Sequence, residues 1–353
     1  MLEARLVLAD GTEYRGETFG ALETASGEVV FNTGMVGYPE NLTDPSYHGQ
    51  ILVLTYPLAG NYGVPPDDFE EGIHRHLESD SIQVEGLVVS SHCANPSHRG
   101  SARSLSEWLA GQGIPGISGI DTRALTKALR ERGTVPGAIV PEGKAAAIED
   151  PNLRNLVREV SIKSPVLYPG GGKKVVLVDC GVKNNIIREL RCRGMAVLRV
   201  PWDHPFHEEE ADAVLLSNGP GDPVTCHETI ENTRKAFARG LPILGICLGS
   251  QIMALAAGAR TYKLPYGHRS QNQPCTETGT KRCHITSQNH GYAVRGETLP
   301  QDWREWFVNV NDGTNEGIYH ISRPFFGVQF HPEAAPGPGD TRFVFDLFAR
   351  SIE

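Results

Sequence analysis

The chain has 353 residues, of which 39% are hydrophobic and 21% are charged, and its formal net charge is −9. This length suits two domains of roughly 100–200 residues each, and the apolar fraction argues against intrinsic disorder. The acidic balance, without any basic run, argues against a nucleic-acid partner. The longest apolar runs fall short of the roughly 20 residues that a membrane-spanning helix needs.

The cysteines and the first residues of the chain indicate a cellular compartment. The seven cysteines are odd in number, and no C-x-x-C pair occurs among them. This usage argues against a disulfide framework or a cysteine-rich zinc module and fits a reducing environment. The opening residues, MLEARLVLADGT, lack the apolar stretch of a signal peptide. We therefore expect a cytoplasmic protein without a membrane association.

Residues 1–140 are predicted to form a mixed β and α domain. A turn at residues 10–11 between two short alternating segments indicates a hairpin. Residues 121–132 predict a helix, because apolar side chains recur there at helical spacing and the glycine that follows can end it. The pattern then dissolves over residues 141–173, where prolines, glycines and lysines cluster, and this stretch is predicted to be a linker.

From residue 174 onward, apolar strands alternate with helical stretches. Strands that are apolar throughout indicate a sheet buried on both faces, and their alternation with helices indicates βαβ units. We therefore predict an α/β fold in which a parallel sheet flanked by helices occupies residues 174–353, after the mixed N-terminal domain. Ligands bind at the carboxyl ends of the strands in such sheets. The predicted strands are 174–179, 195–200, 212–217 and 241–246.

The sequence GICLG, residues 245–249, lies between a predicted strand and a predicted helix. It is the cysteine version of the G-x-S-x-G nucleophile elbow, in which flanking glycines let the strand and the helix pass closely. Cys247 would then sit at a helix N-terminus, where backbone N–H groups favour a thiolate and can stabilise an oxyanion. A buried cysteine beside packing glycines is the alternative interpretation.

A histidine and a carboxylate follow a second apolar segment, in GVQFHPE at residues 327–333. Along a strand, residues i and i+2 point to the same side, so Glu333 can orient the imidazole of His331. A base with an orienting carboxylate is what an activated thiol needs. The spacing favours a triad with Cys247, and an exposed histidine at a strand end is the alternative.

The loop LLSNGPGDP, residues 215–223, follows the third predicted strand of this half. Its glycines, Gly219 and Gly221, can expose backbone N–H groups that suit an anion or an oxyanion, although an ordinary turn would look the same. Neither a phosphate-binding P-loop nor a G-x-G-x-x-G motif occurs, so we expect no ATP or NAD site in this chain. The scattered histidines and cysteines fit no zinc-site spacing, and no metal is predicted.

The motifs GICLGSQ, LSNGPGDP, TSQNHG (286–291) and FHPE together resemble those of the class I, or triad-type, glutamine amidotransferases. The segments 27–63 and 119–133, with HPEAAPGP, further resemble the small chain of carbamoyl phosphate synthetase. This resemblance extends over nearly the whole sequence and is weakest in the predicted linker. It implies a small-chain N-terminal domain followed by a glutamine amidotransferase domain.

The resemblance also implies a role for each matching residue. Cys247 would attack the glutamine carboxamide and form a thioester, His331 would act as general base and acid, and Glu333 would orient it. Two positions depart from the family, with Ser250 where histidine is common and Tyr292 where phenylalanine is frequent. The residues implied to bind L-glutamine are Ser46, Gly219, Gly221, Leu248, Gln251, Asn289, Gly291 and Tyr292.

The family's partner completes the implied reaction. Ammonia would pass through an interior tunnel to a large synthetase chain, which uses bicarbonate and two ATP to make carbamoyl phosphate for pyrimidine and arginine biosynthesis. ATP and magnesium are expected on that partner and no cofactor in this chain, in a heterodimer or a higher hetero-oligomer. The alternatives are the glutaminase domain of a multifunctional pyrimidine-pathway protein, a partner-independent amidase, and a non-catalytic scaffold.

Overall fold

The computed structural model describes residues 2–352. The chain divides into two compact units, Met1–Arg154 and Asn155–Glu353. The predicted linker, 141–173, is therefore no separate segment, because its second half belongs to the second unit. There, β12 (Val166–Tyr168) pairs antiparallel with β14 (Ala196–Pro201). Composition alone assigned these residues to a linker, whereas backbone hydrogen bonds include them in a sheet.

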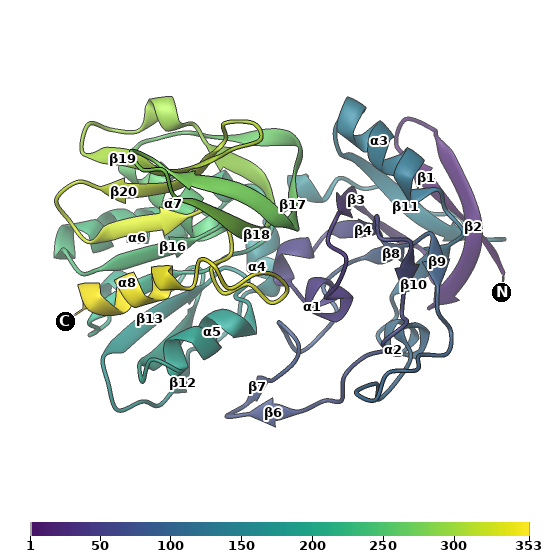
Figure 1. Ribbon diagram of the computed structural model, residues 1–353, viewed down its shortest axis with the longest axis horizontal. Coiled ribbons are helices and arrows are strands. Elements are labelled where there is room, and N and C mark those ends of the chain that lie inside the picture. The colour runs from purple at the N-terminus through teal and green to yellow at the C-terminus, as the bar shows by residue number, and fades with distance from the viewer. Residues whose placement is uncertain (1, 353) are drawn as a thin grey trace. The chain divides into compact units, whose positions relative to one another are not determined.

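The first unit is built on a closed seven-stranded barrel (Figure 1). The predicted hairpin at residues 10–11 is confirmed, with β1 antiparallel to β2 and a left-handed Gly11 (φ 84°) in the turn. Leu52 and Leu87 of the barrel pack with Trp108 in one buried cluster. In barrel order, the strands are β1 (Glu3–Leu8), β11 (Val135–Pro141), β3 (Ala25–Asn32), β4 (Gln50–Leu54), β8 (Gly86–Val88), β10 (Pro115–Ser118) and β2 (Glu13–Gly20).

Side-chain caps start the two longer helices of this unit. Ser104 and Glu107 form a reciprocal capping box at the start of α2 (Leu105–Gly111). The carboxylate of Asp121 accepts from the Ala124 N–H at 2.9 Å and starts α3 (Thr122–Arg132), which confirms the predicted helix. The short elements are α1 (Tyr38–Leu42), the 3₁₀ turns Pro45–Tyr47 and Pro151–Leu153, β5 (Leu58–Ala59), β6 (Phe69–Glu70), β7 (Ile73–His74) and β9 (Ser91–His92).

The second unit contains a ten-stranded sheet whose central part is parallel, as predicted. The four predicted strands are β13, β14, β15 and β16, and β21 adds a fifth parallel strand beside β16. The remaining strands pair antiparallel. In sheet order they are β12, β14, β13 (Lys174–Asp179), β15 (Ala213–Leu216), β16 (Ile243–Ile246), β21 (Phe325–Val328), β20 (Asn315–His320), β19 (Trp303–Asn309), β17 (Thr261–Glu277) and β18 (Cys283–Val294).

Helices cover both faces of this sheet, and neighbouring residues of β21 show it. The Phe326 ring packs against Phe348 of α8, which Figure 1 draws in yellow in front of the sheet. Gly327, the next residue, faces Ser250 of α7 on the opposite face. The helices are α4 (Leu156–Val160), α5 (Asn184–Arg191), α6 (His227–Arg239), α7 (Leu248–Ala257) and α8 (Phe343–Ser351), with 3₁₀ turns at Phe206–Glu208, Pro223–Thr225 and Gly296–Thr298.

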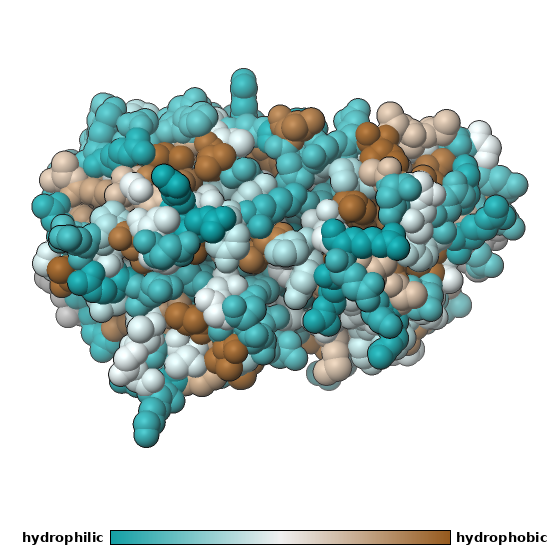
Figure 2. All heavy atoms as spheres, turned by 90° about the horizontal axis from the view of Figure 1, so that it is seen from above, coloured by the Kyte–Doolittle hydropathy of each residue, from teal (hydrophilic) through white to brown (hydrophobic). Residues whose placement is uncertain are grey.

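One face of the molecule is polar with small apolar areas. On the face shown in Figure 2, hydrophobic side chains form separate patches among hydrophilic ones. Across residues 2–352, none of the helices combines the length and the apolar character needed to cross a bilayer.

Candidate active site

Cys247 occupies a strained turn between β16 and α7. Its backbone has φ 53° and ψ −106°, a conformation that non-glycine residues rarely adopt. The flanking glycines are required sterically. A Cβ on Gly245 would lie 2.7 Å from the Gly249 backbone, and a Cβ on Gly249 would lie 2.1 Å from the Leu216 oxygen. The elbow predicted from GICLG is therefore present, with the thiol at the start of a ten-residue helix.

His331 and Glu333 meet beyond the end of β21. His331 Nδ1 lies 2.6 Å from Glu333 Oε1, and both side chains are buried. The predicted pairing is present, but strand periodicity is not its cause. β21 ends at Val328, and the chain turns through left-handed backbone at Ala334 (φ 56°). The Ser287 oxygen accepts the His331 N–H at 2.9 Å and fixes the start of this turn to β18.

Electrostatics tie the imidazole to both the carboxylate and the thiol. Burial alone would lower the pKa of His331, but Glu333 and then Cys247 outweigh it and raise that pKa to about 10. Burial would raise the pKa of Glu333, but Lys183 and His331 lower it to about 2. Among the described residues, none accepts or donates a well-aligned hydrogen bond at His331 Nε2, the nitrogen opposite the one held by Glu333. That nitrogen is therefore available for the thiol proton.

Two residues that the sequence analysis did not select hold the Glu333 segment. Lys183 is 3% exposed, and its Nζ lies 3.1 Å from Glu333 Oε1 and donates to the Ala334 oxygen. Asn185 Nδ2 donates to the Glu333 oxygen. Both residues follow β13 and thus lie at the carboxyl end of a parallel strand. The rule that ligands and functional groups gather at that end is the signal that could have found them.

The predicted oxyanion contacts lie beside the thiol's helix. Leu248 is the first residue of α7, and the first N–H groups of a helix have no carbonyl partner within it. A Cβ on Gly219 would lie 2.0 Å from the Cys180 oxygen and 2.9 Å from Leu248 Cδ2. The glycine loop therefore passes directly against the start of α7. Gly221 has φ 82° and faces the Leu156 side chain instead.

Glutamine side chains connect α7 to the thiol. Gln251 Nε2 donates to the Tyr292 oxygen at 2.7 Å and to Gln329 Oε1 at 2.9 Å. Gln329 Nε2 in turn donates to Cys247 Sγ at 3.5 Å, and the thiol donates to the Asn289 oxygen at 3.7 Å. The structure thus gathers Gln251, Asn289 and Tyr292 around Cys247. It adds Gln329, which the sequence analysis missed although it lies two residues before His331.

Three other selected residues have distinct surroundings. A Cβ on Gly291 would lie 3.3 Å from Arg269 Nη2, so this glycine borders a cation. Ser250 packs tightly against Gly327, because a Cβ added to Gly327 would lie 2.7 Å from Ser250 Oγ. The small serine therefore acts in helix–strand packing. Ser46 belongs to the first unit, where it is buried and its N–H donates to Asp44 Oδ1 at 2.9 Å. Its contact with glutamine stays a prediction.

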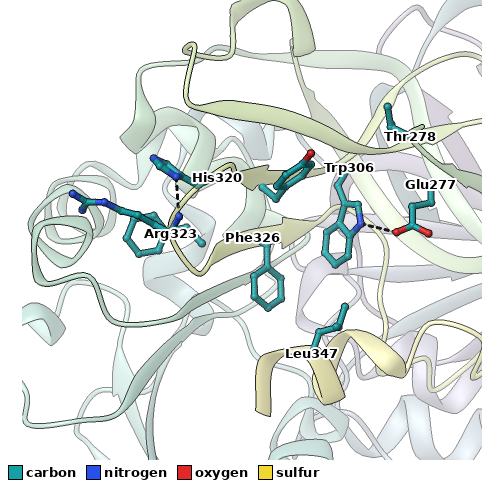
Figure 3. A pocket seen from close by; sticks show the side chains of 9 residues that line it. Glu277, Thr278, Trp306, His320, Arg323, Phe326 and Leu347 are labelled. Atoms are coloured by element: carbon teal, nitrogen blue, oxygen red, sulfur yellow. Dashed lines mark hydrogen bonds between the residues drawn. The ribbon is translucent and has the colours of Figure 1, made fainter. Parts of the chain in front are cut away.

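A pocket of about 380 Å³ lies elsewhere in the second unit, among β19, β20, β21 and α8 (Figure 3). The Trp306 indole forms part of its wall and donates to Glu277 Oε1 at 3.3 Å. No predicted site residue lines it. The pocket is therefore separate from the candidate active site.

Family comparisons agree with this geometry. Residues 176–351 match the family described as glutamine amidotransferase class-I, and residues 6–139 match the family described as carbamoyl-phosphate synthase small chain, CPSase domain. The elbow cysteine and the histidine–glutamate pair lie in the first of these regions. The second unit is therefore a class I glutamine amidotransferase domain.

Full-length relatives define the family more narrowly. The chain is 49% identical over 362 residues to the carbamoyl phosphate synthase arginine-specific small chain of Neurospora crassa, covering 99% of this chain and 80% of that protein. It is 48% identical over 361 residues to the protein of the same name in Aspergillus fumigatus, again covering 99% and 80%. The chain belongs to the carbamoyl phosphate synthase small-chain family.

Larger proteins match the chain as well. It is 54% identical over 352 residues to the Multifunctional protein CAD of Squalus acanthias, covering 98% of this chain but 16% of that protein. The chain thus spans about one sixth of the length of this multifunctional relative.

Proposed function

We propose that this chain hydrolyses L-glutamine to glutamate and ammonia and delivers the ammonia to a large synthetase chain that makes carbamoyl phosphate. One observation carries the proposal: the buried Cys247, His331 and Glu333 come together in a domain that the small-chain N-terminal region precedes. ATP and magnesium would bind to the large chain.

The geometry supports acyl transfer in two stages. His331 Nε2 takes the proton from the Cys247 thiol, and the sulfur attacks the carboxamide carbon. We assign stabilisation of the oxyanion to the N–H groups of Leu248, at the start of α7, and of Gly219, whose loop passes against that helix. The imidazolium then protonates the leaving nitrogen, which departs as ammonia and leaves a γ-glutamyl thioester. Water, deprotonated by the same imidazole, attacks the thioester and releases glutamate and the thiol.

The fixed charges suit these steps. Glu333 stays ionised because Lys183 and His331 lower its pKa, so it can stabilise the imidazolium that forms after each proton transfer. The Lys183 ammonium compensates Glu333, so its charge is not left unpaired in the interior. The strained elbow fixes the backbone of Cys247, and the sulfur lies on a short side chain that has little freedom left to lose.

Glutamate release from L-glutamine, measured with and without a carbamoyl phosphate synthetase large chain, tests the proposal. A slow basal rate that rises steeply with the partner, bicarbonate and ATP supports it. An equal rate under both conditions, once complex formation has been verified, indicates a partner-independent amidase. No glutamate under either condition indicates a non-catalytic scaffold.

One comparison favours a second arrangement, in which the glutaminase is a domain of a longer polypeptide. The 54% identity to a multifunctional protein exceeds the 49% identity to the arginine-specific small chain of Neurospora crassa. The glutaminase function could thus be exercised within one long polypeptide that also carries the synthetase. The length of the native gene product in its source cells, measured by immunoblot, separates the two arrangements.

A further inference from the structure

A second histidine–carboxylate cluster lies beside the active site in the antiparallel part of the sheet. His268 of β17 is directly paired with His290 of β18, and Glu316 lies on β20. One ligand atom from each of the three lies within 4.8 Å of the others, and all three side chains are buried. We call these three residues the His–His–Glu cluster.

Each histidine of this cluster has one ring nitrogen fixed by an acceptor outside it. His290 Nδ1 lies 2.8 Å from the Tyr292 carbonyl oxygen, which can only accept, so Nδ1 carries the proton. His268 Nε2 lies 2.8 Å from Asp312 Oδ2 and donates to it in the same way. Metal-binding histidines are typically held like this, by a carbonyl or carboxylate behind the ring. The lone pairs of His290 Nε2 and His268 Nδ1 then remain for the cluster.

The atoms of the three cluster residues that face one another carry lone pairs, and the Asn309 amide donates to one of them, Glu316 Oε1, at 3.0 Å. His268 Nδ1 lies 3.4 Å from Glu316 Oε1, and His290 Nε2 lies 3.1 Å from the side-chain oxygen of Gln288. The Gln288 amide is oriented by its Nε2, which donates to Thr286 Oγ1 at 3.0 Å. Within residues 2–352, Glu316 Oε2 and His268 Nδ1 are buried and find no hydrogen-bond partner. Lone pairs in such an arrangement need a positive centre between them.

A single proton satisfies only part of this arrangement. A proton on His268 Nδ1 can bridge to Glu316 Oε1, which lies 3.4 Å away. His290 offers no equivalent, because its one ring proton lies on Nδ1, which donates to the Tyr292 oxygen. A neutral His290 leaves its Nε2 lone pair opposite the Gln288 oxygen.

We propose that His268, His290 and Glu316 bind a zinc ion, with the Gln288 side-chain oxygen as a fourth ligand. Two imidazole nitrogens and two oxygens form a donor set that zinc accepts in four-coordinate sites. No metal was expected from the sequence, because these ligands are spread over three strands and share no sequence spacing. The site departs from that expectation and needs no part of the proposed glutaminase reaction.

The ion would stabilise the two segments that contact the Cys247 thiol. The main-chain oxygen of Asn289 accepts a hydrogen bond from the Cys247 thiol, and Asn289 lies between Gln288 and His290 on β18. Gln329 contacts the thiol through its side chain, and its main-chain N–H donates to the main-chain carbonyl oxygen of Glu316 at 2.9 Å. The zinc would therefore be structural, and it would hold the two segments that border the sulfur.

Zinc binding by the full-length chain tests the proposal. The chain, without a polyhistidine tag, is treated with a chelator, dialysed and titrated with ZnCl₂ by calorimetry, and bound metal is counted by elemental analysis. We expect one zinc per chain. Cobalt(II) in its place should show the visible absorption of a tetrahedral nitrogen–oxygen site. A wild-type chain that stays metal-free with a tenfold excess of zinc would refute the proposal.

Variants locate the ion. Glu316→Gln keeps the shape but removes the carboxylate ligand, and we expect zinc affinity to fall by more than the roughly 10–100-fold that loss of an outer hydrogen-bond partner costs. Glu305→Gln makes the same change on the neighbouring strand outside the cluster and should leave affinity unchanged. Cys283→Ser removes an exposed thiol that could bind zinc itself. Loss of the zinc in Cys283→Ser, with retention in Glu316→Gln, would place the ion elsewhere and overturn the proposal.

Discussion

Two buried histidine–carboxylate clusters of the second unit differ in their charge balance. In the candidate active site, Glu333 is compensated by Lys183, and His331 is left to exchange a proton with Cys247. In the His–His–Glu cluster, His268 lies between Glu316 and a second carboxylate, Asp312. In the first cluster a lysine pairs with the carboxylate, whereas in the second cluster two carboxylates share one histidine, His268. The electrostatics of a histidine–carboxylate pair thus depend on its third partner.

Removing the nucleophile should have the largest effect on activity. In Cys247→Ser, glutamate release should fall by about 10⁴-fold or more, because the imidazole would have to activate a hydroxyl, which is a weaker nucleophile than a thiolate. The measurement is glutamate formation with the large chain, bicarbonate and ATP. Cys192→Ser, which changes an exposed cysteine outside the site, is the matched control. Unchanged glutamine-dependent synthesis in Cys247→Ser would contradict the proposed mechanism.

Removing the Lys183 ammonium should make the candidate active site lose the charge balance that distinguishes it from the His–His–Glu cluster. Lys183→Met leaves the buried Glu333 charge without its ammonium, and we expect the free energy of unfolding to fall by about 3–5 kcal/mol. Lys173→Met removes an exposed lysine that lies 3.5 Å from Asp212, and it should cost less than about 1 kcal/mol. Urea unfolding measures both.

A double variant sharpens the same point. Adding Glu333→Gln to Lys183→Met removes both charges, so much of the lost stability should return while activity stays low. A double variant that is less stable than Lys183→Met alone would show that the ion pair does not set the stability of this segment.

Acid should weaken the protein through Glu333. Its pKa falls from the ordinary 4.5 to about 2 on folding, so the folded state binds its proton less readily than the unfolded chain. The resulting stabilisation, roughly 3 kcal/mol, is complete above pH 4.5 and is lost as pH falls toward 2. Urea unfolding of Glu333→Gln across this range should show a shallower loss of stability. Parallel pH curves for the variant and the wild type would contradict this assignment.

Gln329 should act as a positioning residue for the thiol. Gln329→Glu replaces the amide that donates to Cys247 Sγ with a carboxylate, which repels a thiolate. We expect kcat to fall by about 10–100-fold with a smaller change in KM, because the effect is on sulfur reactivity rather than on glutamine binding. Gln301→Glu, in an exposed turn, is the control for the added charge. Equal changes in kcat and KM for both variants would argue against this role.

The elbow glycine should give the smallest effect. Gly245→Ala introduces a Cβ 2.7 Å from the Gly249 backbone, and the required shift should cost about 1–3 kcal/mol of stability. Gly111→Ala is the control, since within the described chain a Cβ there meets no atom within 4 Å. Thermal unfolding compares them, and equal melting temperatures would show that the elbow is not closely packed.

Local patterns predicted much of the fold and part of the site. The four apolar strands, the capped helix at 122–132 and the elbow at Cys247 each depend on residues that are neighbours along the chain. The His331–Glu333 pairing was also predicted, although a turn rather than a strand produces it. Short-range sterics and hydrophobic periodicity are sufficient for such features.

Other features depend on contacts between residues far apart in the sequence. Lys183 reaches Glu333 across 150 residues, and no pattern near either residue reveals the pair. The pairing of His268 with His290 depends on the register of β17 and β18, which shifts between Lys263 and His268. A slip of one residue would turn a side chain to the opposite face of the sheet. The sequence by itself determined the two kinds of domain and the nucleophile's turn, because these follow from local backbone preferences. Only the tertiary structure decided which charges meet in the interior, because register and packing bring distant residues together.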